Sequence, residues 1–239
     1  EGKDNKLSPA TLKASLAGYG SGFAHQMHAS TLSLTQATER GTVYSCDELK
    51  ELCGVASKAG LKTHMDGARF ANALVHLGVT PAAMTWRSGI DIISFGTTKN
   101  GTMMSEAVIT FDKTIAEVVR FKHKRAGFLH SKMRYFTAQL LAYIEGDLWL
   151  QSAAAANGSA ARIARCLAAT PGVRLAHSVD ANQIFAHMPP AVVRALQEAG
   201  IKLRQWPDPS GDLVRLVASY CDPEQLVQQL ERTLAATPR

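Results

Sequence analysis

The sequence predicts an α/β protein with a mostly parallel sheet, followed by a smaller α/β unit. Short apolar runs typical of strands alternate with helical patterns over residues 31–111, as expected for parallel strands joined by helical crossovers. A mostly helical stretch follows over residues 113–169, and its alanine-rich part at 153–169 favours helix. After Pro171 and Gly172, short strand candidates and helices recur.

The first unit is expected to contain strands at 31–36, 61–65, 90–95 and 107–111, and helices at 47–60 and 71–77. The helix after Asp47 has an acidic first turn and a stop at Gly60, and both features are typical of helix ends. Because helix and strand alternate, most of these strands are expected to be parallel.

The second unit is expected to contain strands at 173–175, 183–187, 202–206 and 213–219, and helices at 191–199 and 223–234. A long helix joins the two units. We place the domain boundary near Asp147, which gives one domain at residues 1–146 and a small C-terminal domain at residues 147–239.

Composition and charge are those of an ordinary globular protein, with 239 residues, 46% hydrophobic and 19% charged. The formal net charge is +6, and the basic residues cluster mainly between Arg120 and Arg134. Only Phe121 and Phe128 could stack on bases there, so no nucleic-acid partner is predicted. An anionic cofactor and a carboxylate substrate, or a solvated basic helix face, would each explain the cluster.

Four cysteines, Cys46, Cys53, Cys166 and Cys221, lack metal-binding or redox spacing. They are expected to be small core residues in a reducing compartment, with no metal site. No apolar stretch approaches the roughly 20 residues that span a bilayer, so no membrane partner is predicted and a cytoplasmic location is expected.

The setting of Lys99 is the most informative feature of the chain. An apolar strand ends in the run Ser-Phe-Gly-Thr-Thr-Lys99-Asn-Gly, and an upstream strand ends at Asp66, turns at Gly67 and enters a helix through Arg69. Open α/β sheets bind ligands at the edge where such strands end. A lysine there suits an amine nucleophile, and a carboxylate suits the pyridinium nitrogen of pyridoxal phosphate.

Simpler interpretations remain for each residue taken singly. Asp66 would also serve as a cap for the following helix, and Lys99 as a solvated charge. Arg215 lies in the otherwise apolar strand at 213–219, where it needs a partner. That partner is either a substrate carboxylate bound bidentately or an acidic residue in an internal ion pair.

Several segments resemble the threonine aldolase group of fold-type I pyridoxal phosphate enzymes. They are THMDGARFANAL at 63–74, DIISFGTTKNG at 91–101, SLTQATERGTVY at 33–44, KRAG at 124–127 and VRLV at 214–217. The likeness is strongest to bacterial low-specificity L-threonine aldolases. It implies part of the large, mostly parallel cofactor-binding domain plus a small C-terminal α/β domain, with the strand at 107–111 antiparallel to its neighbour.

The resemblance also implies roles for individual residues. Lys99 would hold pyridoxal 5'-phosphate as a Schiff base, Asp66 would hold its pyridinium nitrogen, and Thr98 would contact the cofactor. Arg69 would contact the cofactor phenolate or the substrate carboxylate, and Arg215 would bind that carboxylate. The implied reaction cleaves L-threonine, L-allo-threonine and related β-hydroxy-α-amino acids to glycine and an aldehyde, in a homodimer or homotetramer.

The chain departs from the family pattern in two respects. The N-terminal part with the phosphate-binding loop is absent, so we expect a truncated chain, with Lys124 or Arg125 as a weaker candidate for phosphate contact. Gln36-Ala37-Thr38 stands where many members have a histidine, which leaves the catalytic base open among His25, His28, an N-terminal histidine and ordered water.

Two other functional classes remain open. One is a different reaction of the same cofactor, either β-elimination or transamination. The other is a non-catalytic fragment that keeps the fold without holding the cofactor. His64 shares a strand face with Asp66 and is expected to be buried and hydrogen-bonded, while the remaining histidines are given packing or surface roles.

Overall fold

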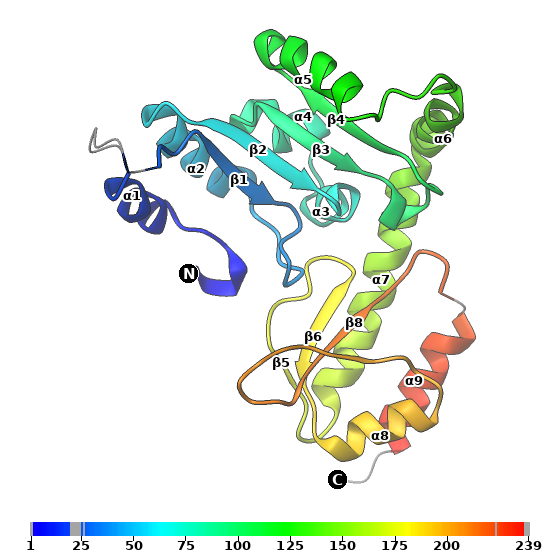
Figure 1. The fold of residues 1–239 in the computed structure, drawn as a ribbon. Helices are drawn as coiled ribbons and strands as arrows, with labels where there is room; N and C mark the ends of the chain where they lie inside the picture. The colour runs from blue at the N-terminus through cyan, green and yellow to red at the C-terminus, as the bar shows by residue number, and fades with distance from the viewer. Residues whose placement is uncertain (1, 20–24, 26, 223, 237–239) are drawn as a thin grey trace.

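The computed structural model describes residues 2–19, 25, 27–222 and 224–236, which form two α/β units. Figure 1 shows helix α7 (Leu148–Ala169) running from the first unit down into the second. The α/β class predicted from the sequence is confirmed.

The first sheet has strand order β1-β2-β3-β4. These strands are β1 (Thr31–Thr35), β2 (Lys62–Gly67), β3 (Ile92–Gly96) and β4 (Glu106–Thr110). The first three are parallel, whereas β4 is antiparallel to β3, as the resemblance implied. The carboxyl ends of β1, β2 and β3 therefore meet at one edge of the sheet, which Figure 1 shows facing α7 and the second unit.

Helices and short 3-10 turns precede, connect and follow these strands. The helices are α1 (Pro9–Ala17), α2 (Cys46–Lys58), α3 (Phe70–Leu77), α4 (Pro81–Met84), α5 (Lys113–Arg125) and α6 (Arg134–Ile144). The 3-10 turns are η1 (Lys3–Asn5), η2 (Trp86–Ser88), η3 (Thr98–Asn100) and η4 (Glu145–Asp147). Residues 9–17, for which the sequence analysis predicts no element, form α1 behind an Ser8 cap and Pro9.

Helix α2 illustrates how local sequence sets an element. The Ser45 hydroxyl accepts a hydrogen bond from the Glu48 amide, and the Glu48 carboxylate accepts one from the Ser45 amide, which forms a capping box. Gly60 follows the helix at a φ of 74°. The predicted helix is thus confirmed, with a start one residue earlier at Cys46.

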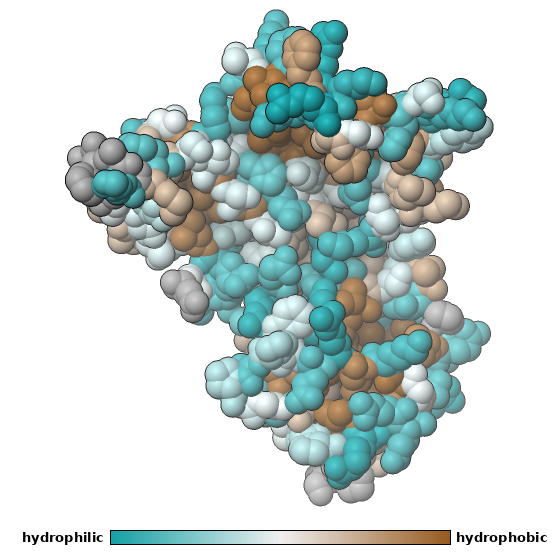
Figure 2. All heavy atoms as spheres, viewed as in Figure 1, coloured by the Kyte–Doolittle hydropathy of each residue, from teal (hydrophilic) through white to brown (hydrophobic). Residues whose placement is uncertain are grey.

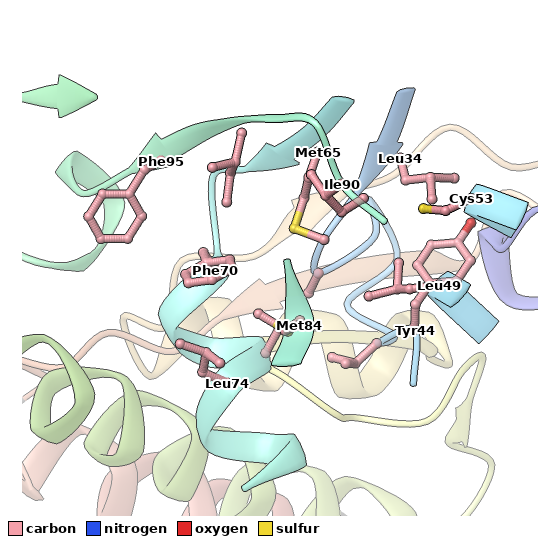
Figure 3. Packing of buried hydrophobic residues seen from close by; sticks show 14 of the residues in the cluster. Leu34, Tyr44, Leu49, Cys53, Met65, Phe70, Leu74, Met84, Ile90 and Phe95 are labelled. Carbon is pink, nitrogen blue, oxygen red and sulfur yellow. The ribbon is translucent and has the colours of Figure 1, made fainter. Parts of the chain in front are cut away.

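The core of the first unit covers one face of its sheet. Leu34 of β1, Met65 of β2 and Phe95 of β3 point into it; Phe95 lies near Phe70 of α3, whereas Leu34 lies near Cys53 of α2 (Figure 3). Because strand residues alternate between faces, this inward set leaves polar residues on the opposite face of the same strands.

That opposite face is largely uncovered. A groove of about 930 Å³ lies there between β3, β4, α5 and α6, with Val108, Phe128 and Phe136 among its lining residues. Figure 2 shows hydrophobic side chains gathered below α5 in this region. None of the 13 residues of α5 is buried. The basic residues at 120–134 lie on α5, on the exposed loop after it and at Arg134, the first residue of α6.

The second unit is an antiparallel sheet of order β5-β6-β8-β7. Its strands are β5 (Arg174–Leu175), β6 (Gln183–His187), β7 (Arg204–Gln205) and β8 (Leu213–Val217). Ile184 and Leu216 lie in a core with helices α7, α8 (Pro190–Glu198) and α9 (Glu224–Ala236). The outer face carries Phe185 and Arg215, which are register partners.

Helix α7 contributes to both cores. Trp149 and Ala153 belong to the first, whereas Ile163 and Leu167 belong to the second. Because one helix serves both units, the predicted boundary between residues 146 and 147 stays a prediction.

The cysteines correct one expectation. All four are free; Cys53 is buried, and Cys46 and Cys166 pack against the two cores. Cys221 is exposed, so the expectation of a core residue is wrong there, because it lies in the loop after β8 rather than on an inward-facing position. Among the described residues, no helix has the length and hydropathy needed to cross a membrane.

Candidate active site

Asp66 lies at the carboxyl end of β2, level with Thr35 of β1 and Ser94 of β3. Its Oδ1 accepts a hydrogen bond of 3.0 Å from the Ala68 amide, so Asp66 does hold the turn into α3. Its Oδ2 has no hydrogen-bond partner among the described residues. Asp66 can therefore cap the turn and still accept a hydrogen bond from a ligand.

Two glycines bring the ends of β2 and β3 together. A Cβ at Gly67 would lie 2.8 Å from the Ser94 carbonyl oxygen, and one at Gly96 would lie 2.6 Å from the Ala68 Cα. Only glycine fits such a close backbone approach. The turn after Asp66 and the segment leading to Lys99 are therefore in contact.

Lys99 lies in η3, on a segment fixed by its neighbours. The Glu106 carboxylate accepts hydrogen bonds from the amides of Thr97 and Thr98, at 3.0 and 3.2 Å. The buried side-chain amide of Asn100 donates hydrogen bonds to the Tyr143 hydroxyl at 2.6 Å and to the Trp149 backbone carbonyl at 2.9 Å. Sequence analysis missed Glu106 and Asn100, because their partners are fixed only by the tertiary fold.

The Lys99 side chain itself is exposed and has no hydrogen bond or ion pair within the described part of the chain. Thr98 is also exposed, and its hydroxyl makes only a 3.4 Å hydrogen bond to the Ser105 carbonyl. The fold thus holds the backbone of this turn while leaving a primary amine and a hydroxyl available.

Arg69 reaches from the first unit to the second. Its Nε donates a hydrogen bond of 3.0 Å to the Asn182 side-chain carbonyl. Burial, and then the nearby charge of Arg215, lower the pKa of Arg69 to about 10, against the opposing charges of Glu39 and Asp66. The two predicted carboxylate-binding arginines therefore lie in each other's electrostatic field.

Arg215 of β8 has no ionic partner among the described residues. Its Nη2 donates to the Gln183 side-chain carbonyl at 2.6 Å, and its guanidinium carbon lies 5.1 Å from the Trp206 ring centroid. Its Nε is buried without a hydrogen-bond partner in the described residues. Burial is the main cause that lowers its pKa. The internal ion pair considered in the sequence analysis is not found there.

The loop after β8 also touches the Lys99 segment. A Cβ at Gly101 would lie 3.8 Å from the Tyr220 ring. Arg215 and Tyr220 thus come from one strand and its following loop, and both face the edge where β2 and β3 end. Asp66, Arg69, Thr98, Lys99 and Arg215 are brought to the junction between the two units.

The histidines divide into two groups. His64 is half-buried and lies between Ser33 Oγ at 2.7 Å and Ser94 Oγ at 3.0 Å, which confirms the expected hydrogen-bonded role. His25 and His28 precede β1, at the amino end of the parallel strands. Asp66 lies at the opposite, carboxyl end of β2, so position along the strands does not favour these two candidates, and the base stays open.

Lys124 and Arg125 lie exposed at the end of α5, and their contact with the cofactor phosphate stays a prediction. Residues absent from the sequence predictions also surround the site, namely Glu39, Asn182, Gln183, Phe185 and Trp206. Only Glu39 had a usable signal, since it lies within the resembling segment at 33–44.

Comparison with known proteins supports the family. The family model described as beta-eliminating lyase matches residues 1–190. The low specificity L-threonine aldolase of Pseudomonas sp. (strain NCIMB 10558) is 40% identical over 205 residues, which cover 86% of this chain and 59% of that protein. The protein of the same name from Pseudomonas aeruginosa is 38% identical over 203 residues, covering 85% and 58%.

Solved structures agree. A Leishmania major threonine aldolase matches with a TM-score of 0.88 and 26% identity, over 97% of this chain and 67% of that one. An aspartate aminotransferase from Rhodobacter sphaeroides shares the fold, with a TM-score of 0.68 and 16% identity over 99% and 62%. The fold is that of fold-type I pyridoxal phosphate enzymes. The chain spans less than two thirds of the curated relatives' length, and it belongs to the beta-eliminating lyase family.

Proposed function

We propose that this chain carries the lysine, carboxylate and arginine part of a pyridoxal phosphate-dependent aldolase. Its substrates would be L-threonine, L-allo-threonine and related β-hydroxy-α-amino acids, cleaved to glycine and an aldehyde. The observation that carries the proposal is the junction itself, where Asp66 and the Lys99 turn lie at the carboxyl ends of β2 and β3, and where Arg69 and Arg215 form no ion pair within the described residues.

The residues present fit the cofactor. Lys99 offers a primary amine on a fixed turn, and Oδ2 of Asp66, which has no partner among the described residues, would accept a hydrogen bond from the protonated pyridinium nitrogen. When bound, pyridoxal phosphate supplies an electron-accepting ring for the Cα–Cβ cleavage. Asp66 would keep that ring protonated, because an ionised carboxylate favours a proton on its hydrogen-bond partner.

Arg215 and Arg69 would bind the substrate carboxylate. The buried Nε of Arg215 has no hydrogen-bond partner in the part of the chain that the structure describes, and carboxylates satisfy guanidinium groups bidentately. Gln183 and the Trp206 ring orient its guanidinium without neutralising it. Burial, and then the charge of Arg215, lower the pKa of Arg69, and a bound carboxylate would offset the second of these effects.

A cofactor titration tests the proposal. Purified chain is titrated with pyridoxal phosphate while visible absorbance is recorded, for wild type, Lys99→Ala and the exposed-lysine control Lys58→Ala. A saturable band lost only in Lys99→Ala supports the assignment. Equal bands in all three variants refute it, and no band in any of them supports the alternative of a non-catalytic fragment.

Product analysis separates the reactions open to this family. Threonine cleavage yields acetaldehyde and glycine, β-elimination yields a keto acid and ammonia, and transamination moves the amino group to an acceptor. The aldolase is favoured because both curated Pseudomonas relatives carry that name. A keto acid with ammonia as the main product would instead support the β-eliminating alternative.

The assembly and location of the protein are also proposals. The resemblance supports a homodimer or homotetramer, and the four free cysteines suit the reducing compartment expected of a cytoplasmic protein. Light scattering coupled to size exclusion would measure the mass directly, and a monomer at every concentration would contradict the assembly.

A further inference from the structure

A second cleft lies beside the proposed active site. It encloses about 550 Å³ between the N-terminal segment, the loop at 38–42 and the outer face of the second sheet. Its charged lining consists of Asp4, Lys6, Arg40, His177, His187 and Asp208. None of the residues assigned above to the cofactor or the substrate carboxylate lines it.

Most of these charges are already paired. Lys6 contacts Glu48 at 2.9 Å, His177 contacts Asp4 at 3.1 Å and His187 contacts Asp212 at 2.7 Å. The Asp208 carboxylate accepts hydrogen bonds from the Ser210 hydroxyl and amide. Among the described lining residues, this leaves Arg40 as the cation without an acidic hydrogen-bond partner.

Arg40 is fixed by its surroundings. Its guanidinium carbon lies 5.3 Å from the Phe185 ring centroid and 5.7 Å from that of Trp206. The next residue, Gly41, packs directly on β6, since a Cβ there would lie 3.0 Å from the Gln183 carbonyl oxygen. The backbone and two aromatic rings therefore hold Arg40 at the wall of the cleft.

The Nη1 of Arg40 is buried and has no hydrogen-bond partner in the described residues. Aromatic faces attract a cation, but they do not accept the in-plane N–H bonds of a guanidinium. A buried donor without an acceptor is unfavourable, and a planar guanidinium pairs best with an oxyanion.

An anion is stable in this neighbourhood. The pKa of Asp208 is lowered mainly by hydrogen bonds from Ser210, then by the charge of His187, and last by the charge of Arg40. The field of Arg40 thus reaches the cleft and favours negative charge there.

We propose that this cleft binds a small oxyanion, a carboxylate or phosphate group, with Arg40 as its anchor. The site is separate from the proposed substrate site on Arg215, although both arginines lie against Phe185 and Trp206. Neither Lys99 nor the cofactor takes part in it.

Calorimetry tests the proposal. The purified chain is titrated with inorganic phosphate and, separately, with succinate, which distinguishes a phosphate from a carboxylate ligand. Arg40→Met should raise the dissociation constant by about tenfold or more, since it removes a charge-assisted hydrogen bond. Arg40→Lys should bind with intermediate affinity, because it keeps the charge without the planar fork. Neutral succinamide should not bind.

Arg204→Met is the matched control. Arg204 lies 5.6 Å from the same Trp206 ring but lies on an exposed strand outside the cleft, so its loss should leave the affinity unchanged. Lys99→Ala should also keep anion binding, which separates this proposal from the cofactor assignment. The proposal is overturned by absent saturation with both anions, by equal affinity in the Arg40 variants, or by loss only in Arg215→Met.

Discussion

Gly96 and Gly54 show how differently one residue type acts in this chain. Gly96 lies where two backbone segments meet, and an added Cβ would be 2.6 Å from the Ala68 Cα. Gly54 lies inside α2, where an added Cβ would meet nothing within 4 Å. The first glycine is required by space, whereas the second only weakens its helix.

Alanine at these two positions should therefore change stability in opposite directions. Gly96→Ala should lower the free energy of unfolding by about 1–3 kcal/mol, because the strand ends must move apart. Gly54→Ala should raise it by about 0.5–1 kcal/mol through helix propensity. Urea denaturation of both variants measures the changes, and a stabilised Gly96→Ala would contradict the close approach of β2 and β3.

Cys53 and Cys221 should differ in reactivity with pH. Burial, and then the charge of Asp91, raise the pKa of the Cys53 thiol from its ordinary 9.0 to about 11. At pH 8 iodoacetamide should label exposed Cys221 quickly and Cys53 only after unfolding, because the thiolate is the reactive form. Mass spectrometry of the labelled chain would show the order.

The same pKa predicts how stability depends on pH. The folded state holds the Cys53 proton more tightly than the unfolded state, so this contribution is full below pH 9 and is lost as pH rises toward 11. The urea midpoint of unfolding should drop between pH 8 and pH 10.5, and this drop should be smaller for Cys53→Ala than for wild type. An equal drop of the midpoint in both proteins would contradict the raised pKa of Cys53.

At the scale of elements, helix α2 depends on its capping box. Ser45→Ala should lower the free energy of unfolding by about 1 kcal/mol, because it removes the hydroxyl that accepts a hydrogen bond from the Glu48 backbone amide. Ser57→Ala is the control, since Ser57 is exposed within the last turn and caps nothing. Thermal unfolding followed by circular dichroism compares the two variants, and equal losses would argue against the cap.

Elements with strong local patterns could be predicted from sequence, and elements fixed by neighbours could not. Strand β6 has the predicted bounds, Gln183–His187, because an apolar run sits between turn residues. Strand β7 shrinks from 202–206 to Arg204–Gln205, since it pairs only with β8 at an edge. Helix α1 was missed because Leu12 is its one fully buried side chain among the described residues, so no apolar stripe marks it.

The site follows the same division. Asp66 and Lys99 could be proposed from the sequence because Asp66 lies at the end of β2 and Lys99 lies in the turn directly after β3. The partners of Arg69 and Arg215, Asn182 and Gln183, lie 113 and 32 residues away in the chain. Such contacts depend on how the second sheet meets the first, and no local pattern encodes that placement.

At the scale of the whole molecule, the groove on the open sheet face should bind an apolar dye. Anilinonaphthalene sulfonate should fluoresce with native chain, because large exposed apolar patches take up such ligands. Phe128→Ser should weaken the signal, since Phe128 lines the groove, whereas Phe121→Ser on α5 should change it less. No fluorescence above that of a compact control protein would contradict an accessible groove.

Helix α7 has a consequence for cooperativity. At 22 residues it is about 33 Å long, and its two halves complete two different cores. Phe70 stacks on Trp149 near one end, while Arg162 pairs with Glu224 and Glu231 of α9 nearer the other. Loss of either core would leave half of this helix without its packing partners. We therefore expect that unfolding of one unit destabilises the other through α7, so that both units unfold in one cooperative transition.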